Sequence, residues 1–189
     1  MQEEARFPER LESERLVLRR YSSADAPFLL TVVERNRDRL VQSFPQMSRG
    51  FSCGEQAVSF VEEKREQWES RKGFAFGIWH KASSQLIGQL LVKNVAWEVP
   101  SAELSYFIDV LSQRQGFASE AVSTTLRTAF EQLGFKRIFV RIIPSNTESA
   151  LLAKKLGFHH EGFHRNEFRC GHGELHDVHY FSLTSEDSR

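Results

Sequence analysis

The chain has 189 residues, 40% of them hydrophobic and 26% charged, which is ordinary for a globular protein with one sizeable core. Its 25 Lys and Arg residues balance 25 Asp and Glu residues, so the composition shows no sign of a nucleic-acid partner. No apolar run approaches the roughly 20 residues that cross a bilayer, and the charged start has no apolar signal-peptide segment. Cys53 and Cys170 make no disulfide framework. We therefore expect a reduced, cytoplasmic protein without a nucleic-acid or membrane partner.

The first half of the sequence predicts a strand, two helices and a β-hairpin. After an alternating stretch, Ser22–Pro27 supplies capping residues and an early proline, which is a signature of a helix start. Residues 36–40 either continue that helix or break it, and residues 44–54 are predicted to form a loop. Two later apolar runs flank a short polar turn and indicate a hairpin. The expected elements are strand 15–21, a helix through Val33, helix 55–70, and strands 73–79 and 86–92.

The stretch Ser101–Asn146 predicts a strand, a turn, a helix and a second strand. Residues 101–109 alternate apolar and polar side chains, and residues 113–121 form a glycine-containing turn that leads into a helix. That helix ends near Gly134, and a β-branched strand follows at residues 138–143. The first amides of a helix have no intrahelical partner, so a turn of this kind is an anion site. The sequence therefore predicts a ligand that carries phosphate.

The last part of the chain predicts a short helix and a terminal hairpin. Residues 148–156 form a helix that a glycine stops. Strands 158–168 and 175–183 follow, joined by a glycine-containing turn. Because one crossover helix links the two strands of the central stretch, we expect a mixed α+β sheet. The whole chain, residues 1–189, is expected to be a single domain with its core at about residues 15–183.

Gln113-x-x-Gly116-x-Ala118 resembles the acetyl-CoA pyrophosphate loop of the Gcn5-related N-acetyltransferase (GNAT) superfamily, whose consensus is Q/R-x-x-G-x-G/A. The strand before this loop, and the signatures N-x-x-S and K-x-G-F after the next strand, occur in the order that the family shows. Arg15–Arg19 is also similar to the R-L-x-L-R start of the RimJ/RimL-type branch, the ribosomal-protein N-acetyltransferases. The matching segments are Glu103–Ile108, Gln113–Ala118, Asn146–Ser149 and Lys155–Phe158.

The resemblance implies a mostly antiparallel twisted sheet with one splayed parallel strand pair, flanked by helices. It also implies acetyl-CoA as the acetyl donor, and no metal. The turn and the helix amides would donate to the pyrophosphate, and the strand end would pair with pantetheine. Asn146 and Ser149 are equally ordinary helix caps, and Lys155 an ordinary solvated lysine. The implied cofactor-binding residues are Phe107, Ile108, Asp109, Gln113, Arg114, Gln115, Gly116, Phe117, Ala118, Ser119, Asn146, Ser149 and Lys155.

Acyl transfer to an amine needs a route for the amine proton, donors for the oxyanion and help for the departing thiolate. The resemblance implies that the amide near Ile108 binds the oxyanion. Glu103 and Glu167 are the candidate bases, although each is also an ordinary strand carboxylate. Residues 152–154 hold no tyrosine, where many family members carry the general acid, so Ser149 is the remaining hydroxyl. We expect direct transfer without a covalent enzyme intermediate.

Several alternatives stay open at this point. The acceptor could be a protein N-terminal amine, an amino acid, a polyamine or another small amine. A noncatalytic acyl-CoA-binding module of the same fold is an alternative function, whereas a nucleotide-phosphate protein is disfavoured because the chain lacks G-x-x-x-x-G-K-[ST]. A zinc site from Cys170, His172, His176 and His179 is disfavoured because the spacing fits no closed structural set. The protein is a monomer or a homodimer.

Overall fold

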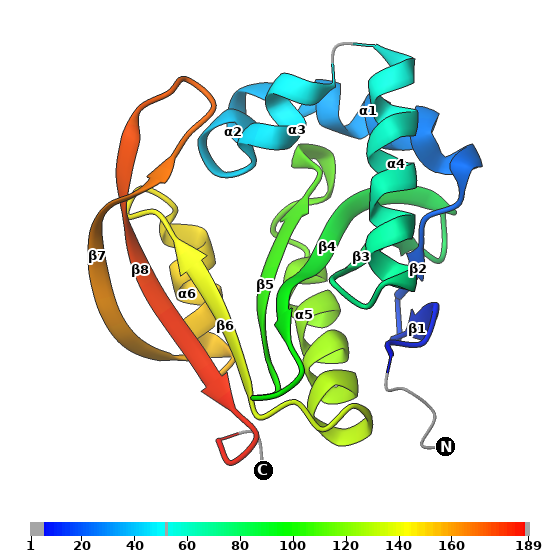
Figure 1. Ribbon diagram of the computed structural model, residues 1–189. Coiled ribbons are helices and arrows are strands. Elements are labelled where there is room, and N and C mark those ends of the chain that lie inside the picture. The colour runs from blue at the N-terminus through cyan, green and yellow to red at the C-terminus, as the bar shows by residue number, and fades with distance from the viewer. Residues whose placement is uncertain (1–5, 52, 188–189) are drawn as a thin grey trace.

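The computed structural model describes residues 6–51 and 53–187, and an eight-stranded sheet forms its centre (Figure 1). The strand order across the sheet is β1-β2-β3-β4-β5-β6-β8-β7. Neighbouring strands are antiparallel except β5 and β6, which are parallel because a helix connects them as a crossover. The predicted mixed sheet with one parallel pair is therefore confirmed. The strands are β1 (Arg10–Glu12), β2 (Leu16–Arg20), β3 (Phe74–His80), β4 (Gln85–Ala96), β5 (Ser101–Ile108), β6 (Arg137–Ile142), β7 (His159–Arg169) and β8 (Leu175–Thr184).

Helices cover both faces of the sheet. In Figure 1, α5 and α6 lie behind the strands, α4 lies in front of β3, and α2 and α3 lie above the gap between β5 and β6. The α-helices are α1 (Ala26–Arg35), α2 (Arg37–Ser43), α3 (Pro45–Gly50), α4 (Gly54–Glu69), α5 (Phe117–Arg127) and α6 (Thr147–Lys155). Short 3-10 turns span Ser23–Asp25 and Val110–Ser112, and a π-helical turn, Thr128–Gln132, extends α5.

The prediction of a loop at residues 44–54 is wrong for its first part, because Pro45–Gly50 forms α3. Proline suits the first helical position, where its fixed φ is helical and its missing N–H has no role. Met47 and Phe51 are buried in one cluster with residues of α1 and α4. Tertiary packing therefore stabilises this short helix. It has too few residues to show the 3.6-residue periodicity of apolar side chains by which a helix is recognised in a sequence. Residue 52 lies outside the described residues.

Residues 36–40 end one helix and begin the next. Asn36 caps the C-terminus of α1 and directly precedes α2. Its buried side chain donates from Nδ2 to the Val32 carbonyl at 2.8 Å and to the Asp109 carboxylate at 2.9 Å. Its Oδ1 accepts from the Val110 amide at 2.9 Å. These bonds tie the corner between α1 and α2 to the end of β5.

Aromatic rings form a large part of the core. Phe74 and Phe76 of β3 are fully buried, and Trp68 of α4 packs edge-on against them, with ring centroids 5.1 and 4.9 Å away. Such pairs stabilise by about 0.5–1.5 kcal/mol beyond the area they bury. The three-residue strand β1 was not predicted, because it is too short to show alternation. It adds Leu11 to the same core.

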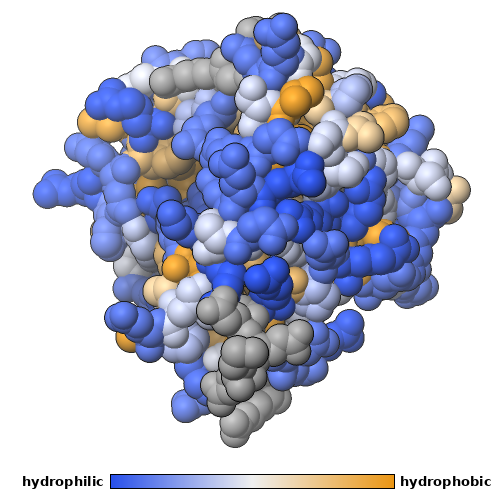
Figure 2. Space-filling model, turned by 45° about the vertical axis from the view of Figure 1, so that its right-hand side comes forward, coloured by the Kyte–Doolittle hydropathy of each residue, from blue (hydrophilic) through white to orange (hydrophobic). Residues whose placement is uncertain are grey.

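Among the described residues, the structure has no helix of the length and apolar character that crossing a bilayer requires. Figure 2 shows one face of the molecule, covered mainly by hydrophilic residues, with hydrophobic residues in small separate groups.

Candidate active site

The strands β5 and β6 separate partway along their length. They pair only from Ser101 opposite Arg137 to Glu103 opposite Phe139, although β5 runs on to Ile108. Figure 1 shows the two strands close together at one end and diverging toward the other. Beyond the last pair, the backbone N–H and C=O groups on the facing edges of β5 and β6 do not hydrogen-bond the other strand.

Two residues of β5 present backbone groups to this gap. The Asp109 amide donates to the Ile87 carbonyl at 2.8 Å, next to β4. Because the direction of hydrogen bonding alternates along an antiparallel strand, Phe107 also bonds toward β4, while Tyr106 and Ile108 face the gap. The sequence predicted that residues 107–110 pair with an extended ligand. Within that range the backbone groups of Ile108 face the gap, and Tyr106, outside it, faces the gap as well.

A groove of about 740 Å³ extends from this gap to the N-terminus of α5. The end of β5, the turn before α5, the start of α6 and residues of α2 surround it. Most of the predicted cofactor-binding residues line this groove, namely Phe107, Ile108, Gln113, Arg114, Gly116, Phe117, Ala118, Ser119, Asn146, Ser149 and Lys155.

The turn before α5 presents donors to the groove. Gly116 has a φ of 81°, in the left-handed region that favours glycine. The amides of Phe117–Ser119 are in the first turn of α5, where a helix supplies no acceptor. Arg15 braces the turn, because its Nη1 donates to the Gln115 carbonyl at 2.9 Å and its Nη2 pairs with Glu120 at 2.7 Å. Donors at the positive end of a helix suit a phosphate.

Two of the predicted cofactor-binding residues, Asp109 and Gln115, do not line the groove. Asp109 is 2% exposed, and its carboxylate accepts from the Arg35 guanidinium and the Asn36 amide. Gln115 has its carbonyl bound to Arg15. Asp109 therefore supplies the buried negative charge that pairs with Arg35 at the end of β5. Gln115 holds the turn before α5 through the hydrogen bond that its carbonyl accepts from Arg15.

Three polar side chains meet where the gap is narrow. Asn146 caps α6, because its Oδ1 accepts from the Ser149 amide at 3.1 Å, and its Nδ2 remains as a donor. The Tyr106 phenol lies beside the Ser149 side chain, which favours the ionised phenol and so opposes the effect of burial on its pKa. Burial raises the pKa of Tyr106 to about 12, so this phenol is neutral at neutral pH. Tyr106 was not among the predicted site residues, although alternation with Leu104 and Ile108 places it on the cofactor side.

On the other side of the gap, the groove meets two smaller chambers of about 70 and 320 Å³. Tyr106, Asn146 and Ser149 line both the groove and the first chamber. Phe44 and Phe168 line both chambers, so α2 and the β7–β8 hairpin enclose this space from opposite sides. A ligand in the groove and a ligand in the chambers would therefore meet at the Tyr106–Ser149 pair.

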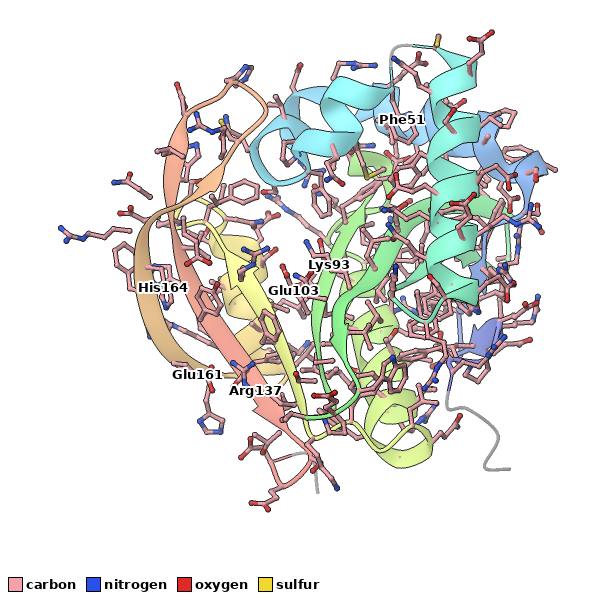
Figure 3. All side chains as sticks on the ribbon, viewed as in Figure 1. Phe51, Lys93, Glu103, Arg137, Glu161 and His164 are labelled. Atoms are coloured by element: carbon pink, nitrogen blue, oxygen red, sulfur yellow. The ribbon has the colours of Figure 1, made fainter. Side chains whose placement is uncertain are left out.

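Glu103 lies at the floor of the first chamber, with its side chain 4% exposed. Its Oε1 accepts from Lys93 Nζ at 3.2 Å and from Arg141 Nε at 3.1 Å. Its Oε2 accepts from Asn94 Nδ2 at 2.6 Å and from Arg141 Nη2 at 3.1 Å. Figure 3 shows Glu103 and Lys93 directed into the gap between β5 and β6. Both oxygens are fully engaged, which argues against Glu103 as the base.

Glu167 of β7 contacts Arg141 on the side away from the two chambers. Its carboxylate accepts from the Tyr180 hydroxyl and pairs with His164 Nδ1 at 2.7 Å and with Arg141 Nη1 at 3.5 Å. The hydrogen bond from Tyr180, together with the charges of His164 and Arg141, lowers the pKa of Glu167. A lowered pKa makes a weaker base, and Glu167 is absent from the lining of both chambers. Neither predicted carboxylate is thus a free base in this structure.

One group of metal-ligating residues lies at the turn between β7 and β8. Ligand atoms of Cys170, Glu174 and His176 are all within 4.8 Å of one another. His172 and His179, which the sequence associates with them, are not members of this group. The group is apart from the residues that line the groove and the two chambers.

Comparisons with known proteins agree with this geometry. Residues 15–159 match the family model of the acetyltransferase (GNAT) domain. The uncharacterized N-acetyltransferase YoaA of Bacillus subtilis is 28% identical over 173 residues, which cover 92% of this chain and 95% of that protein. The ribosomal protein uS5-alanine N-acetyltransferase of Escherichia coli is 28% identical over 182 residues, which cover 94% of this chain and 92% of that protein.

A solved structure shares the fold. It is a RimL ribosomal L7/L12 alpha-N-protein acetyltransferase in complex with coenzyme A, and it matches with a TM-score of 0.88 at 20% identity. The match covers 96% of this chain and 100% of that one. The family match extends over most of the chain, and the relatives are named N-acetyltransferases. The protein therefore belongs to the GNAT family of acetyltransferases, in its RimJ/RimL-type branch, and is an N-acetyltransferase.

Proposed function

We propose that acetyl-CoA is the acetyl donor, with its pyrophosphate at the N-terminus of α5 and its pantetheine arm beside β5. The observation that carries this proposal is that the Gly116 turn, the open edge of β5 and Asn146 surround one groove. These groups fit the cofactor, because helix amides bind phosphate and an open strand edge pairs with a peptide-like arm. The coenzyme A in the RimL relative of the same fold supports the assignment.

In the proposed reaction, a neutral amine in the first chamber attacks the thioester carbonyl. A C–N bond forms, the resulting oxyanion accepts from the Ile108 amide, and the C–S bond then breaks as CoA leaves as a thiolate. The proton that the amine loses passes to water, because Glu103 has no free lone pair in the chamber and Glu167 is a weakened base. The departing sulfur takes up one proton, so the overall proton count balances.

The Tyr106 hydroxyl, which lies beside Ser149, donates a hydrogen bond to the leaving sulfur. A free thiol has a pKa of about 8.5, far below the value of about 12 to which burial raises the pKa of Tyr106. Proton transfer from the phenol to the thiolate is therefore uphill. Tyr106 acts as a donor that keeps its proton and stabilises negative charge on sulfur, and solvent supplies the final proton.

The proposed acceptor is a primary amine at the end of a peptide or protein chain. A surface hollow of about 610 Å³ shares Pro45, Gln46 and Phe60 with the second chamber. A surface hollow that adjoins the second chamber suits a chain end entering with its amine first. The Escherichia coli relative is named for the alanine of a ribosomal protein, which supports a peptide acceptor.

The test measures acetyl-CoA affinity by calorimetry and CoA release with a panel of N-terminal peptides and small amines. Wild-type protein is expected to bind acetyl-CoA and release CoA with at least one amine. Gly116→Glu should abolish binding, because it places a carboxylate at the phosphate site and forces a side chain into a left-handed conformation. Gly54→Glu is the matched control, since a side chain there meets open space.

Two results would contradict the proposal. Unchanged acetyl-CoA affinity in Gly116→Glu would remove the cofactor from this groove. Acetyl-CoA binding without turnover on any amine of the panel would favour the noncatalytic acyl-CoA-binding module.

A further inference from the structure

The chambers on the acceptor side are lined by more cations than anions. Their charged lining residues are the three cations Lys64, Lys93 and Arg141 and the single acid Glu103. The three cations come from α4, β4 and β6, so no local stretch of sequence contains them together. An excess of positive charge beside a site for amines is unexpected, because an ammonium group would be repelled there.

The single acid is already neutralised. Both oxygens of Glu103 accept from Lys93, Arg141 and Asn94 at 2.6–3.2 Å. A carboxylate with all its acceptor directions in use offers little attraction to an incoming ammonium. Glu103 is therefore a paired charge. The lining cations also have acidic partners outside the lining, Glu63 for Lys64 and Glu167 for Arg141, so what the chambers offer a ligand is the remaining lysine donors.

Lys64 is the more buried of the two lysines that line the chambers, and its Nζ lies 5.0 Å from the centroid of the Phe60 ring. Its side chain is 10% exposed, which is unusual for lysine. Nζ donates to Glu63 at 2.9 Å and to Gln67 at 3.2 Å, but Glu63 is 55% exposed and so is a weakly held, solvent-screened partner. Lysine carries three donors. Lys93 also keeps donors for a ligand, because it pairs only with Glu103 among the described residues and its side chain is 39% exposed.

We propose that the acceptor is an amine that carries a carboxylate close to its reacting nitrogen, and that Lys64 and Lys93 bind this carboxylate. The inference rests on the proposed function and names its substrate class. A carboxylate in the second chamber would pair with the two lysines while the amine points toward Tyr106 and Ser149. The positive charge of the two lysines favours the neutral form of the amine that attacks, and the proton of the ammonium form passes to water.

Two sources offer this chemistry. One is a peptide whose second or third residue is acidic, and the other is a free amino acid with its own α-carboxylate. The chambers and the adjoining surface hollow favour neither source, so the test contains both. Polyamines, which carry only positive charge, are the acceptors that this chamber disfavours.

The experiment measures kcat/KM for CoA release with matched acceptors. The peptide pair is Ala-Glu and Ala-Gln at the start of otherwise identical amidated peptides, and the amino-acid pair is glutamate and its diamide, glutaminamide. We expect the acidic member of at least one pair to be preferred by about tenfold, as a charge-assisted hydrogen bond allows. Lys64→Met and Lys93→Met should remove that preference, and Lys93→Glu should reverse it. Lys72→Met, at an exposed lysine outside the chamber linings, should retain it.

Equal kcat/KM within both pairs, or faster turnover of spermidine than of every carboxylate-bearing amine, would overturn the inference and leave the acetyltransferase proposal intact. A preference that survives in both lysine variants would also overturn it. Failure to bind acetyl-CoA would instead overturn the proposed function, and the inference with it. The calorimetric titration with acetyl-CoA separates these cases.

Discussion

The Tyr106 hydroxyl lies where the cofactor groove meets the acceptor chambers. It lies beside the Ser149 side chain on α6. Because the phenol is partly buried and its pKa is raised to about 12, it remains a hydrogen-bond donor over the whole range in which the protein would work. A fixed neutral donor that costs no reorganisation is a strong way to stabilise developing charge.

Tyr106→Phe should therefore lower kcat by about 10²-fold and leave KM for acetyl-CoA nearly unchanged. The loss should be the same from about pH 6 to about pH 9, because a phenol with a raised pKa does not ionise in this range. Steady-state kinetics across this pH range measures both expectations. Tyr180→Phe is the control, since Tyr180 bonds Glu167 and is outside the chamber linings. Wild-type kcat in Tyr106→Phe would exclude the proposed role.

At the scale of elements, the N-terminus of α5 is held by the start of β2. Glu120 of α5 accepts from the Ser13 hydroxyl, the Arg15 amide and Arg15 Nε, each at 2.7 Å. The Arg15 guanidinium also lies 4.6 Å from the centroid of the Phe117 ring. One carboxylate thus joins two elements that are distant in sequence and sets the position of the Gly116 turn.

Glu120→Gln should lower the free energy of unfolding by about 1–2 kcal/mol at pH 7, since charge-assisted hydrogen bonds are lost. Burial opposes ionisation of Glu120, but the bonds from Arg15 and Ser13 outweigh it and lower its pKa in the folded protein. A lowered carboxyl pKa stabilises the fold above the unfolded value of about 4.3. This contribution is lost as the pH falls through the folded value, so the difference between wild type and variant should shrink in acid.

Urea unfolding at a series of pH values measures this difference. Glu55→Gln is the control, because Glu55 also lies in the first turn of a helix, α4, and is exposed. A wild-type minus Glu120→Gln difference that stays constant below the usual glutamate pKa would contradict the assignment.

At the scale of the whole molecule, the sheet behaves as two halves joined at one end. The short β5–β6 ladder, with the Lys136 and Arg137 amides bonded to the Pro100 carbonyl, closes that end. At the other end β5, the last strand of the first half, and β6, the first strand of the second half, lie apart (Figure 1). The donor groove lies on the α5–α6 side and the acceptor chambers on the side of α2, α3 and α4.

Acetyl-CoA that occupies the gap should slow hydrogen exchange at the Tyr106 and Ile108 amides, which face away from β4. The Phe107 amide is the internal control, because it already bonds within the β4–β5 ladder. Ligand at about 100 times its Kd should also add about 2.7 kcal/mol to the free energy of unfolding. Hydrogen exchange followed by mass spectrometry, with and without acetyl-CoA, tests this. Equal exchange at Tyr106 and Ile108 in both states would place the ligand elsewhere.

Local signals in the sequence predicted the order of elements and the donor site. Alternation marked β5, a glycine and a helix start marked the turn at Gly116, and strand–helix–strand order required the parallel pair. These features depend on residues that are close in sequence, because the conformation of a left-handed turn or an amphipathic strand is set largely by the residues within it. The short helix α3 escaped prediction because burial of Met47 and Phe51 holds it.

The acceptor side was decided by tertiary structure alone. Alternation placed Glu103 on a strand face, but only the fold brings Arg141, 38 residues away, and Lys93 to its carboxylate. The Tyr106–Ser149 contact likewise joins β5 to α6. Whether a carboxylate is a free base or a saturated ion pair depends on charges from strands and helices that are distant in sequence, and no local pattern encodes their convergence. The sequence by itself therefore determined the glycine turn and helix start at which we propose that the donor binds, and only the tertiary structure decided which charges line the chambers beside it.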